Sequence, residues 1–430
     1  MRPVAELHGM ETGFDDDLHA FIGKCAGLWR GSATEAPVPA FTFDAGEQRQ
    51  NERETDRLID TLAGELRNYP RGEKKQSAWR KRIFLSLRRI GTESFRFPDR
   101  HFDIIFSPEY FAVTKAFARR AYAFDREIES AALAQALRNV WVMNCLQMFL
   151  GRRPSLQPSM FAYSMLYPYT DNDLDRTDLS REAKETANRR LGFRLAGGSC
   201  DPLNANEAAV FRLVEMIESE YPRDRFPEIY QSLLAIHAGQ VKSLRQQGKS
   251  CILNEESLLQ ISIEKGGSSV LADGWLAGGK LCREEAGFFF SFGVMLQLLD
   301  DLQDLPDDLH AGHWTLFMRA ASHDECLDSL TNRLWHFMDR VLDLTDNCAE
   351  PGSLELKDLI RRNCRMLLLR SVAECACYYS SGYLSHMERL SPLSFAFLRD
   401  RRMASERRFA AIWPALARQR NLRSIFDLLG

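Results

Sequence analysis

The chain has 430 residues, of which 45% are hydrophobic and 27% are charged. These proportions are typical of a globular protein with a large core, and they argue against a disordered chain. The 56 Lys and Arg residues are balanced by 59 Asp and Glu residues, giving a net charge of -3. The chain therefore lacks the global basic excess that nucleic-acid binding usually requires, and we expect no nucleic-acid partner.

The sequence contains no candidate for a transmembrane segment or a secretory peptide. Its longest apolar stretch, Gly287 to Leu299, is shorter than the roughly 18–20 residues that cross a bilayer, and it runs straight into Asp300. The N-terminus is acidic where a secretory peptide is basic and then apolar. The ten cysteines form no CxxC pair, which favours reduced thiols. We therefore expect a cytoplasmic protein.

The N-terminal region has two distinct parts. Residues 31–58 combine Gly and Pro with a polar, charged run, which predicts a loop and places a boundary near residue 60. We therefore expect an N-terminal extension with a polar linker over 1–60 and a helical domain over 61–430. Residues 69–91 arrange Lys and Arg around Trp79, Ile83 and Leu87, which predicts a basic amphipathic helix. Its cations either face water or make peripheral contact with an anionic membrane or an acidic partner.

Helical spacing dominates the rest of the chain. In residues 206–221, Val210, Leu213 and Ile217 follow the helical period, and Asn206 is the expected N-cap. The next helix is expected to begin at Pro227 and to end before Gly248. Strand pairs with hairpin turns and internal repeats are not evident in the sequence. The predicted fold class is all-α.

Two acidic clusters carry the functional signal. Asp171 and Asp175 are four residues apart, which places them on one helix face, and Asp300 and Asp304 repeat this spacing with Asp301 beside them. Like charges at this spacing destabilise an isolated helix by about 0.2–0.5 kcal/mol per pair. For either cluster alone, a solvated acidic helix end is an equal alternative. Two clusters favour a cation between them, and Mg²⁺, which prefers carboxylate and phosphate oxygens, is the natural candidate.

The order of these features resembles the class I isoprenoid synthase superfamily of trans-isoprenyl diphosphate synthases, terpene synthases and squalene/phytoene synthases. Residues 297–304 (QLLDDLQD) are similar to the second aspartate-rich motif FQxxDDxxD, with Leu296 in place of Phe. Residues 171–175 (DNDLD) are similar to the first motif DDxxD, with Asn in its second place. Gly239-Gln240 and the segment 265–268 (KGGS) lie between them in the family's order. The resemblance covers roughly residues 160–320.

This resemblance implies a helical bundle around a central apolar cavity, with the acidic clusters facing each other across its mouth. It implies three Mg²⁺ ions, or Mn²⁺ instead, bound by Asp171, Asp175, Asp300, Asp301 and Asp304. The segment 297–316 is also similar to the QLTNxxRDxxxDxxxGRxYLP motif of squalene and phytoene synthases, in which Asp304 and Asp308 are the ligands. Pro306 removes a helical hydrogen bond between these two residues, so the sequence leaves open which pair faces the cavity.

Cationic residues are implied at the substrate's diphosphate. Lys265 matches the family's diphosphate-binding lysine, although an exposed helix-end lysine is the alternative. Arg189 and Arg190 lie downstream of the first cluster, somewhat like the family's RRG, and surface arginines are an equal alternative. His237 and Gln240 share a helix face, and the histidine is either a base or an ordinary core residue.

Several aromatic residues lie near the motifs in sequence, and each is either a cavity wall or ordinary core packing. They are Phe161, Tyr163, Trp275, Phe288, Phe289, Phe290 and Phe292. His310 and His313 suggest a metal site only weakly, because no third ligand accompanies them.

The expected function is ionisation of an allylic prenyl diphosphate, most simply by a terpene synthase that releases diphosphate and forms a cyclic or linear terpene. No GGKxxRP-type motif for isopentenyl diphosphate is present in the sequence, which weighs against chain elongation. Alternatives are a head-to-head or chain-elongating prenyltransferase, a non-catalytic homologue that binds a prenyl diphosphate, and a helical scaffold unrelated to isoprenoids. A homodimer is common among members of the superfamily.

Overall fold

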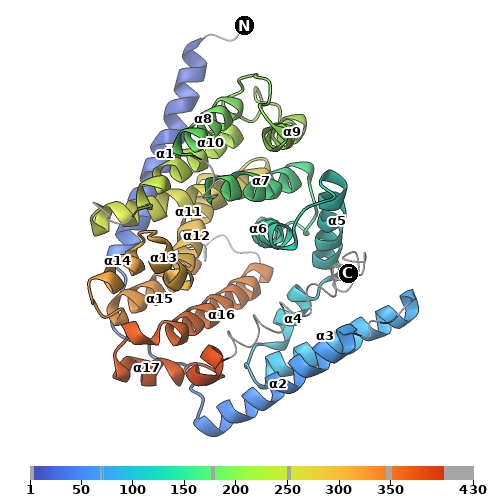
Figure 1. Cartoon of the computed structure of the whole chain (residues 1–430), viewed down its shortest axis with the longest axis vertical. Helices are drawn as coiled ribbons and strands as arrows, with labels where there is room; N and C mark the ends of the chain where they lie inside the picture. Colours follow the sequence, from blue (N-terminus) through green and yellow to red (C-terminus); the bar gives the residue numbers. More distant parts are fainter. Residues whose placement is uncertain are drawn as a thin grey trace.

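The computed structural model describes residues 4–67, 70, 72–175, 180–248, 253–344 and 351–400 of the chain. The described residues form α-helices and two short 3-10 helices, without a β-strand among them, so the all-α fold class is confirmed. Figure 1 shows α11 and α12 near the middle of the molecule, with α8–α10 at one end and α15–α17 at the other. Cys251 and Cys348 lie outside the description, and the eight described cysteines are free thiols.

The elements follow one another in this order: α1 Val4–Arg30, α2 Ala45–Arg67, α3 Glu73–Glu93, α4 Asp99–Ile105, α5 Pro108–Phe124, α6 Ser130–Phe149, α7 Pro158–Asp175, α8 Arg181–Leu195, α9 Ala205–Glu220, α10 Pro227–Ser243, η1 Leu244–Gln246, α11 Glu255–Gly278, α12 Arg283–Gln303, α13 Leu305–Ala311, α14 Leu316–Ser322, α15 Asp328–Leu342, α16 Pro351–Glu374, η2 Ala376–Tyr378 and α17 Ser381–Glu388. None of the helices in the described ranges combines the length and apolar character that crossing a bilayer demands.

The central pair, α11 and α12, packs closely because glycines line its contact. A Cβ atom added at Gly266 would lie 2.7 Å from the carbonyl oxygen of Gly293, and one added at Gly293 would overlap the carbonyl of Gly266. On the other side of α11, a Cβ at Gly239 of α10 would lie 3.1 Å from the Cα of Lys265. Small residues thus bring the backbones of three consecutive helices together, at the level of Lys265.

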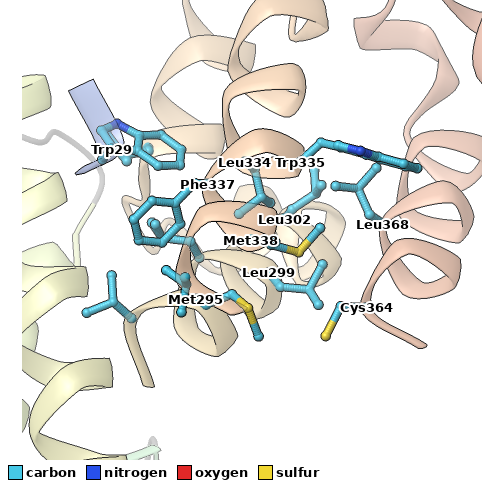
Figure 2. Close-up of a cluster of buried hydrophobic side chains, with 14 of the residues drawn as sticks. Trp29, Met295, Leu299, Leu302, Leu334, Trp335, Phe337, Met338, Cys364 and Leu368 are labelled. Atoms are coloured by element: carbon cyan, nitrogen blue, oxygen red, sulfur yellow. The ribbon is translucent and has the colours of Figure 1, made fainter. Parts of the chain in front are cut away.

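The larger hydrophobic cluster lies between α12, α15 and α16, and α1 closes it. Figure 2 shows Met295 and Leu299 of α12 beside Phe337 and Met338 of α15. The ring of Trp29 from α1 meets Phe337 edge-on, with 5.6 Å between the ring centroids. A second cluster joins α5, α6, α7, α9 and α10. Full burial of such side chains contributes roughly 1.5–3 kcal/mol each, so these two clusters fix the helices that carry the acidic residues.

The N-terminal region differs from the expectation. The loop predicted over 31–58 covers only 31–44, because α2 begins at Ala45, and the boundary expected near residue 60 lies inside this helix. Gln48 and Asn51 of α2 are buried and donate hydrogen bonds to backbone carbonyls at 388–392 and to that of Ser94. Helix α1 buries Phe21, Cys25 and Trp29 in the larger core cluster. Helix α1 therefore contributes to the same core as α12, α15 and α16.

Most of the expected helix boundaries agree with the structure. The basic helix predicted over 69–91 is α3, and Pro227 is the first residue of α10. The cap of α9 is the exception: its N-cap is Asn204, whose side chain accepts from the amide of Glu207, and not Asn206. The side-chain Nδ2 of Asn206 instead donates to the carbonyl of Tyr169, which ties α9 to α7.

Candidate functional site

The second acidic cluster lies at the corner where α12 meets α13. Asp304 follows the last residue of α12 as its C-cap, and its backbone amide donates to the carbonyl of Asp300 at 2.9 Å. The amide of Asp308 donates in turn to the carbonyl of Asp304 at 2.8 Å, across the corner. Pro306, which has no N–H to donate, starts a new helix here without destroying the helical spacing. Asp300, Asp304 and Asp308 therefore follow each other at successive helical turns.

These carboxylates line a cavity of about 230 Å³, which we call the acidic cavity. Its walls come from α10, η1, α11, α12, α13 and the segment 313–315. The lining residues are Gln240, Ser243, Leu244, Gln246, Gln247, Ser262, Lys265, Gln297, Asp300, Asp301, Asp304, Asp308, His313 and Thr315. The two sequence registers, one with Asp300, Asp301 and Asp304 and the other with Asp304 and Asp308, thus converge on one cavity.

Asp301 is the most firmly held of the four carboxylates. Its side chain is 6% exposed, and it accepts hydrogen bonds from Ser262 Oγ and Gln297 Nε2, both at 2.8 Å. Asp300 and Asp304 are open to the cavity, and Asp308 is half-buried. The carboxylate of Asp301 is thus held in place by its two hydrogen bonds, and the other three carboxylates present oxygen atoms to the interior of the cavity.

The acidic cavity raises the pKa of every carboxyl group in it. Limited hydration and the neighbouring carboxylates raise the pKa of Asp304 to about 6 and that of Asp308 to about 8. Burial is also the main cause of the raised pKa values of Asp300 and Asp301. Near neutral pH the four carboxyl groups therefore resist simultaneous ionisation, and a cation in the cavity would reduce the repulsion between their negative charges.

Lys265 and Arg138 are the cations whose charges oppose this effect. The positive charge of each lowers the pKa values of Asp300 and Asp304. Lys265 lines the acidic cavity from α11, where the close glycine contacts fix its backbone against α10 and α12. Arg138 is exposed on α6 and was not identified from the sequence, because it lies in no motif.

A small, mostly apolar pocket of about 30 Å³ adjoins the acidic cavity. Gln240 lines both spaces, and His237 lines the smaller one, so the shared helix face predicted for these residues faces the site. His237 Nε2 lies 2.9 Å from the carbonyl oxygen of Asn188, and burial lowers the pKa of its imidazole. The ring is therefore neutral near neutral pH. Gly192 allows this position, since a Cβ there would lie 2.8 Å from His237 Cε1.

A row of polar groups behind the apolar pocket was missed by the sequence analysis. Tyr167 Oη lies 2.6 Å from Ser269 Oγ and 3.4 Å from Tyr163 Oη. Deeper in the core, the fully buried Asp273 accepts from Asn139 Nδ2 at 2.9 Å, and burial raises the pKa of its carboxyl group well above the usual value. No motif includes Asp273; its only signal was that it is the single charged residue in the second half of α11, residues 266–278.

Several predicted site residues lie elsewhere. The guanidinium of Arg190 forms a two-point ion pair with Glu207 of α9, and that of Arg189 donates to Thr186 on the exposed side of α8. Neither arginine lines the acidic cavity. His310 is exposed on α13, whereas His313 lines the cavity wall.

Most of the aromatic residues expected near the motifs are core residues. Phe161, Phe288, Phe289, Phe290 and Phe292 are buried in the two hydrophobic clusters. Trp275 is partly buried against both clusters, and Tyr163 lines the apolar pocket.

The first acidic cluster is only partly described. Asp171 and Asp175 belong to the last turns of α7, as predicted, but their side chains lie outside the described part of the structure. Among the described side chains, no three of the His, Cys, Asp and Glu residues are arranged as a ready metal site. The donor set nevertheless fits a hard divalent cation, because the carboxylates of Asp300, Asp304 and Asp308 line the acidic cavity and accept no hydrogen bond from the side chains that the structure describes.

The chain was compared with known proteins in three ways. It matches no protein-family model, no curated protein and no solved structure.

Proposed function

We propose that the acidic cavity binds Mg²⁺ together with the diphosphate of an allylic prenyl substrate, and that the protein is a class I isoprenoid synthase of the terpene synthase type. The observation that carries this proposal is the convergence of Asp300, Asp301, Asp304 and Asp308 on one cavity that also contains Lys265. Their raised pKa values support it, because crowded carboxylates favour a bound cation.

The bound Mg²⁺ would neutralise the charge that develops on the departing diphosphate. Asp300, Asp304 and Asp308 are the residues that would hold it, with Asp171 and Asp175 of α7 as further candidates. Lys265 would contact the diphosphate as a point charge, on the side of the cavity formed by α11.

The apolar pocket would receive the reactive end of the prenyl chain. Tyr163 and Tyr167 line it, and aromatic faces stabilise a nearby cation by about 0.5–2 kcal/mol. His237, which is neutral near neutral pH, is placed to accept a proton at the end of the reaction. At about 30 Å³ the pocket has room for about one or two water molecules. Substrate binding therefore requires side chains of α7, α8 or α10 to move.

A head-to-head condensing enzyme is the second candidate. The lining of the cavity by Asp308 favours it, because Asp304 and Asp308 are the pair that the squalene and phytoene synthase motif implies. A condensing enzyme joins two allylic chains, whereas a terpene synthase converts one. Products therefore distinguish the two functions.

The test is incubation of the purified full chain with Mg²⁺ and prenyl diphosphates from C10 to C25, with and without isopentenyl diphosphate. Released diphosphate and extractable products are measured. Asp300→Asn/Asp304→Asn removes two charges from the cavity with little change of shape and is expected to abolish the reaction. Asp307→Asn is the matched control, because Asp307 is exposed at the same corner but does not line the cavity.

A hydrocarbon or alcohol from a single substrate would support the terpene synthase. Coupled products that keep no diphosphate would identify head-to-head condensation, and longer diphosphates formed only with isopentenyl diphosphate would identify chain elongation. Absence of diphosphate release from every substrate would refute catalysis. Binding of a prenyl diphosphate analogue without turnover would then identify a non-catalytic binding protein.

A further inference from the structure

Helices α2 and α3 form a two-helix arm along one edge of the molecule (Figure 1). Trp79 and Ile83 of α3 are buried, and Leu62 of α2 and Leu87 of α3 pack against them. Besides α2, helix α3 packs on α4. This small hydrophobic cluster decides which side of α3 turns toward α2 and which side faces away from it.

The side of α3 that its contacts with α2 and α4 leave exposed is strongly basic. At about 100° per residue, seven side chains fall within roughly 60° of one line along this helix. They are Lys74, Lys75, Ala78, Lys81, Arg82, Leu85 and Arg89, which we call the basic face. Between residues 74 and 92, α3 has seven Lys and Arg residues and no acidic residue. The basic face therefore lacks negative charges of its own.

Only part of this charge is balanced by α2. Arg82 Nη2 lies 3.6 Å from Glu65 Oε2, and Arg89 Nη2 lies 3.6 Å from Glu54 Oε2. Both arginine side chains are about 60% exposed, and ion pairs of this kind contribute little. Lys74, Lys75 and Lys81 are exposed and form no ion pair with another described residue. At least three positive charges on the basic face thus remain for a partner.

The apolar residue at the centre of the basic face indicates the kind of partner. Leu85 is 58% exposed, and Lys81, Arg82 and Arg89 lie three or four residues away on the same side of the helix. On an anionic membrane the cations would meet the phosphates of the headgroups, and the exposed side chain of Leu85 would reach the acyl boundary between them. A nucleic acid would satisfy the cations but would offer Leu85 no apolar contact, and an acidic protein would have to place an apolar side chain among its carboxylates.

We propose that the basic face of α3 docks the protein on an anionic lipid bilayer. The arm then lies flat on the membrane, with Leu85 inserted and the lysines and arginines at the level of the headgroups. This proposal does not depend on the proposed function, since no residue of the arm lines the acidic cavity.

The experiment measures binding of the full chain to sedimented vesicles of phosphatidylcholine with about 30% phosphatidylserine, beside pure phosphatidylcholine. Lys74→Gln/Lys75→Gln/Lys81→Gln is expected to lower the partition coefficient onto anionic vesicles about 100-fold. Each lost cation removes about 1 kcal/mol of attraction, and every 1.4 kcal/mol corresponds to a tenfold change in binding. Leu85→Ser is expected to lower it roughly tenfold through the lost apolar contact. Since all four side chains are exposed, the variants should keep the wild-type far-UV circular dichroism.

The matched control removes three exposed cations from other surfaces, in Lys24→Gln/Arg126→Gln/Lys280→Gln. The proposal is supported if this control binds as wild type does. It also requires that wild type binds more weakly when added salt shortens the Debye length from about 10 Å to about 3 Å. Equal loss in the control variant, equal binding to neutral vesicles, or no binding to anionic vesicles would overturn it. Loss in the lysine variant with no effect of Leu85→Ser, and competition by a soluble polyanion, would identify an acidic macromolecule instead and would also overturn it.

Discussion

Replacing Asp308 by Asn should stabilise the metal-free protein in a way that depends on pH. The pKa of Asp308 rises from 3.8 to about 8 in the folded chain, because burial and the charges of Asp301, Asp304 and Asp300 disfavour its ionised form. Below about pH 4 the group is protonated in both the folded and the unfolded chain and contributes nothing. Between about pH 4 and pH 8 the folded chain retains a proton that the unfolded chain releases, so the free energy of unfolding falls as the pH rises. Asn carries no charge and should lack this loss.

The size of the effect follows from the pKa shift. At 1.36 kcal/mol per pKa unit, the full shift corresponds to ~6 kcal/mol. Asp308 is partly exposed and shares its titration with three other carboxyl groups, so we discount this figure by half, to ~3 kcal/mol above pH 8. For a chain of this length the entropy of unfolding is ~0.9 kcal/mol/K, which converts the gain into a rise in Tm of ~3 °C.

The assay is thermal unfolding of chelator-treated wild type, Asp308→Asn and Asp307→Asn between pH 5 and pH 9. The Asp308→Asn variant should be more stable than wild type by an amount that grows with pH, and Asp307→Asn, whose side chain is exposed outside the cavity, should follow wild type. Added Mg²⁺ should raise the Tm of wild type at pH 8 more than that of Asp308→Asn. Parallel curves for wild type and Asp308→Asn at every pH would refute the idea that the carboxylates crowd one another.

Three further predictions concern packing and binding. Gly293→Ala should lower the free energy of unfolding by about 3 kcal/mol or more in denaturant titrations, because its Cβ overlaps the backbone of α11. Gly23→Ala, which has open space around it, should raise the free energy of unfolding by up to about 1 kcal/mol. Equal effects of the two variants would contradict the close contact of α11 and α12. Leu302→Ala, at a fully buried position in the cluster of Figure 2, should lower the free energy of unfolding by about 2–5 kcal/mol. Leu354→Ala, at a position that is 53% exposed, should change it by less than about 0.5 kcal/mol. Lys265→Gln should weaken calorimetric binding of inorganic diphosphate with Mg²⁺ roughly 10–100-fold, and unchanged affinity would remove Lys265 from the site.

The parts of the molecule that the sequence predicts well are those governed by local periodicity. The apolar stretch before Asp300 forms the buried helix α12, and the four-residue spacing of Asp300, Asp304 and Asp308 survives the corner at Pro306 because the amides on either side still find helical carbonyls. The sequence could not decide between the two aspartate registers, and the structure shows why the choice was unnecessary. Both registers line one cavity.

The parts that the sequence did not predict depend on contacts between distant segments. Helix α2 begins at Ala45 behind a local capping box of Asp44 and Glu47, a signal that the sequence analysis overlooked. Its position in the fold, set by bonds from Gln48 and Asn51 to backbone near residues 94 and 388–392, is revealed by no local rule. Arg190 turns away from the acidic cavity because its partner Glu207 comes from a different helix. Neighbouring asparagines compete for the cap of α9, and Asn204 takes this position while Asn206 bonds to Tyr169.

The corner at Asp304 also determines which changes of chain length the protein can tolerate. Since Asp300, Asp304 and Asp308 share one face through an unbroken four-residue spacing, a single residue inserted between Asp304 and Asp308 would turn the latter by about 100°, away from its neighbours. The connecting segment 31–44 is not helical, so a residue added between its points of contact, such as Pro37 and Phe43, rotates no neighbour about a helix axis. Insertions and deletions should therefore accumulate in segments such as 31–44, while the number of residues from Asp300 to Asp308 stays constant even where the residue types between them change.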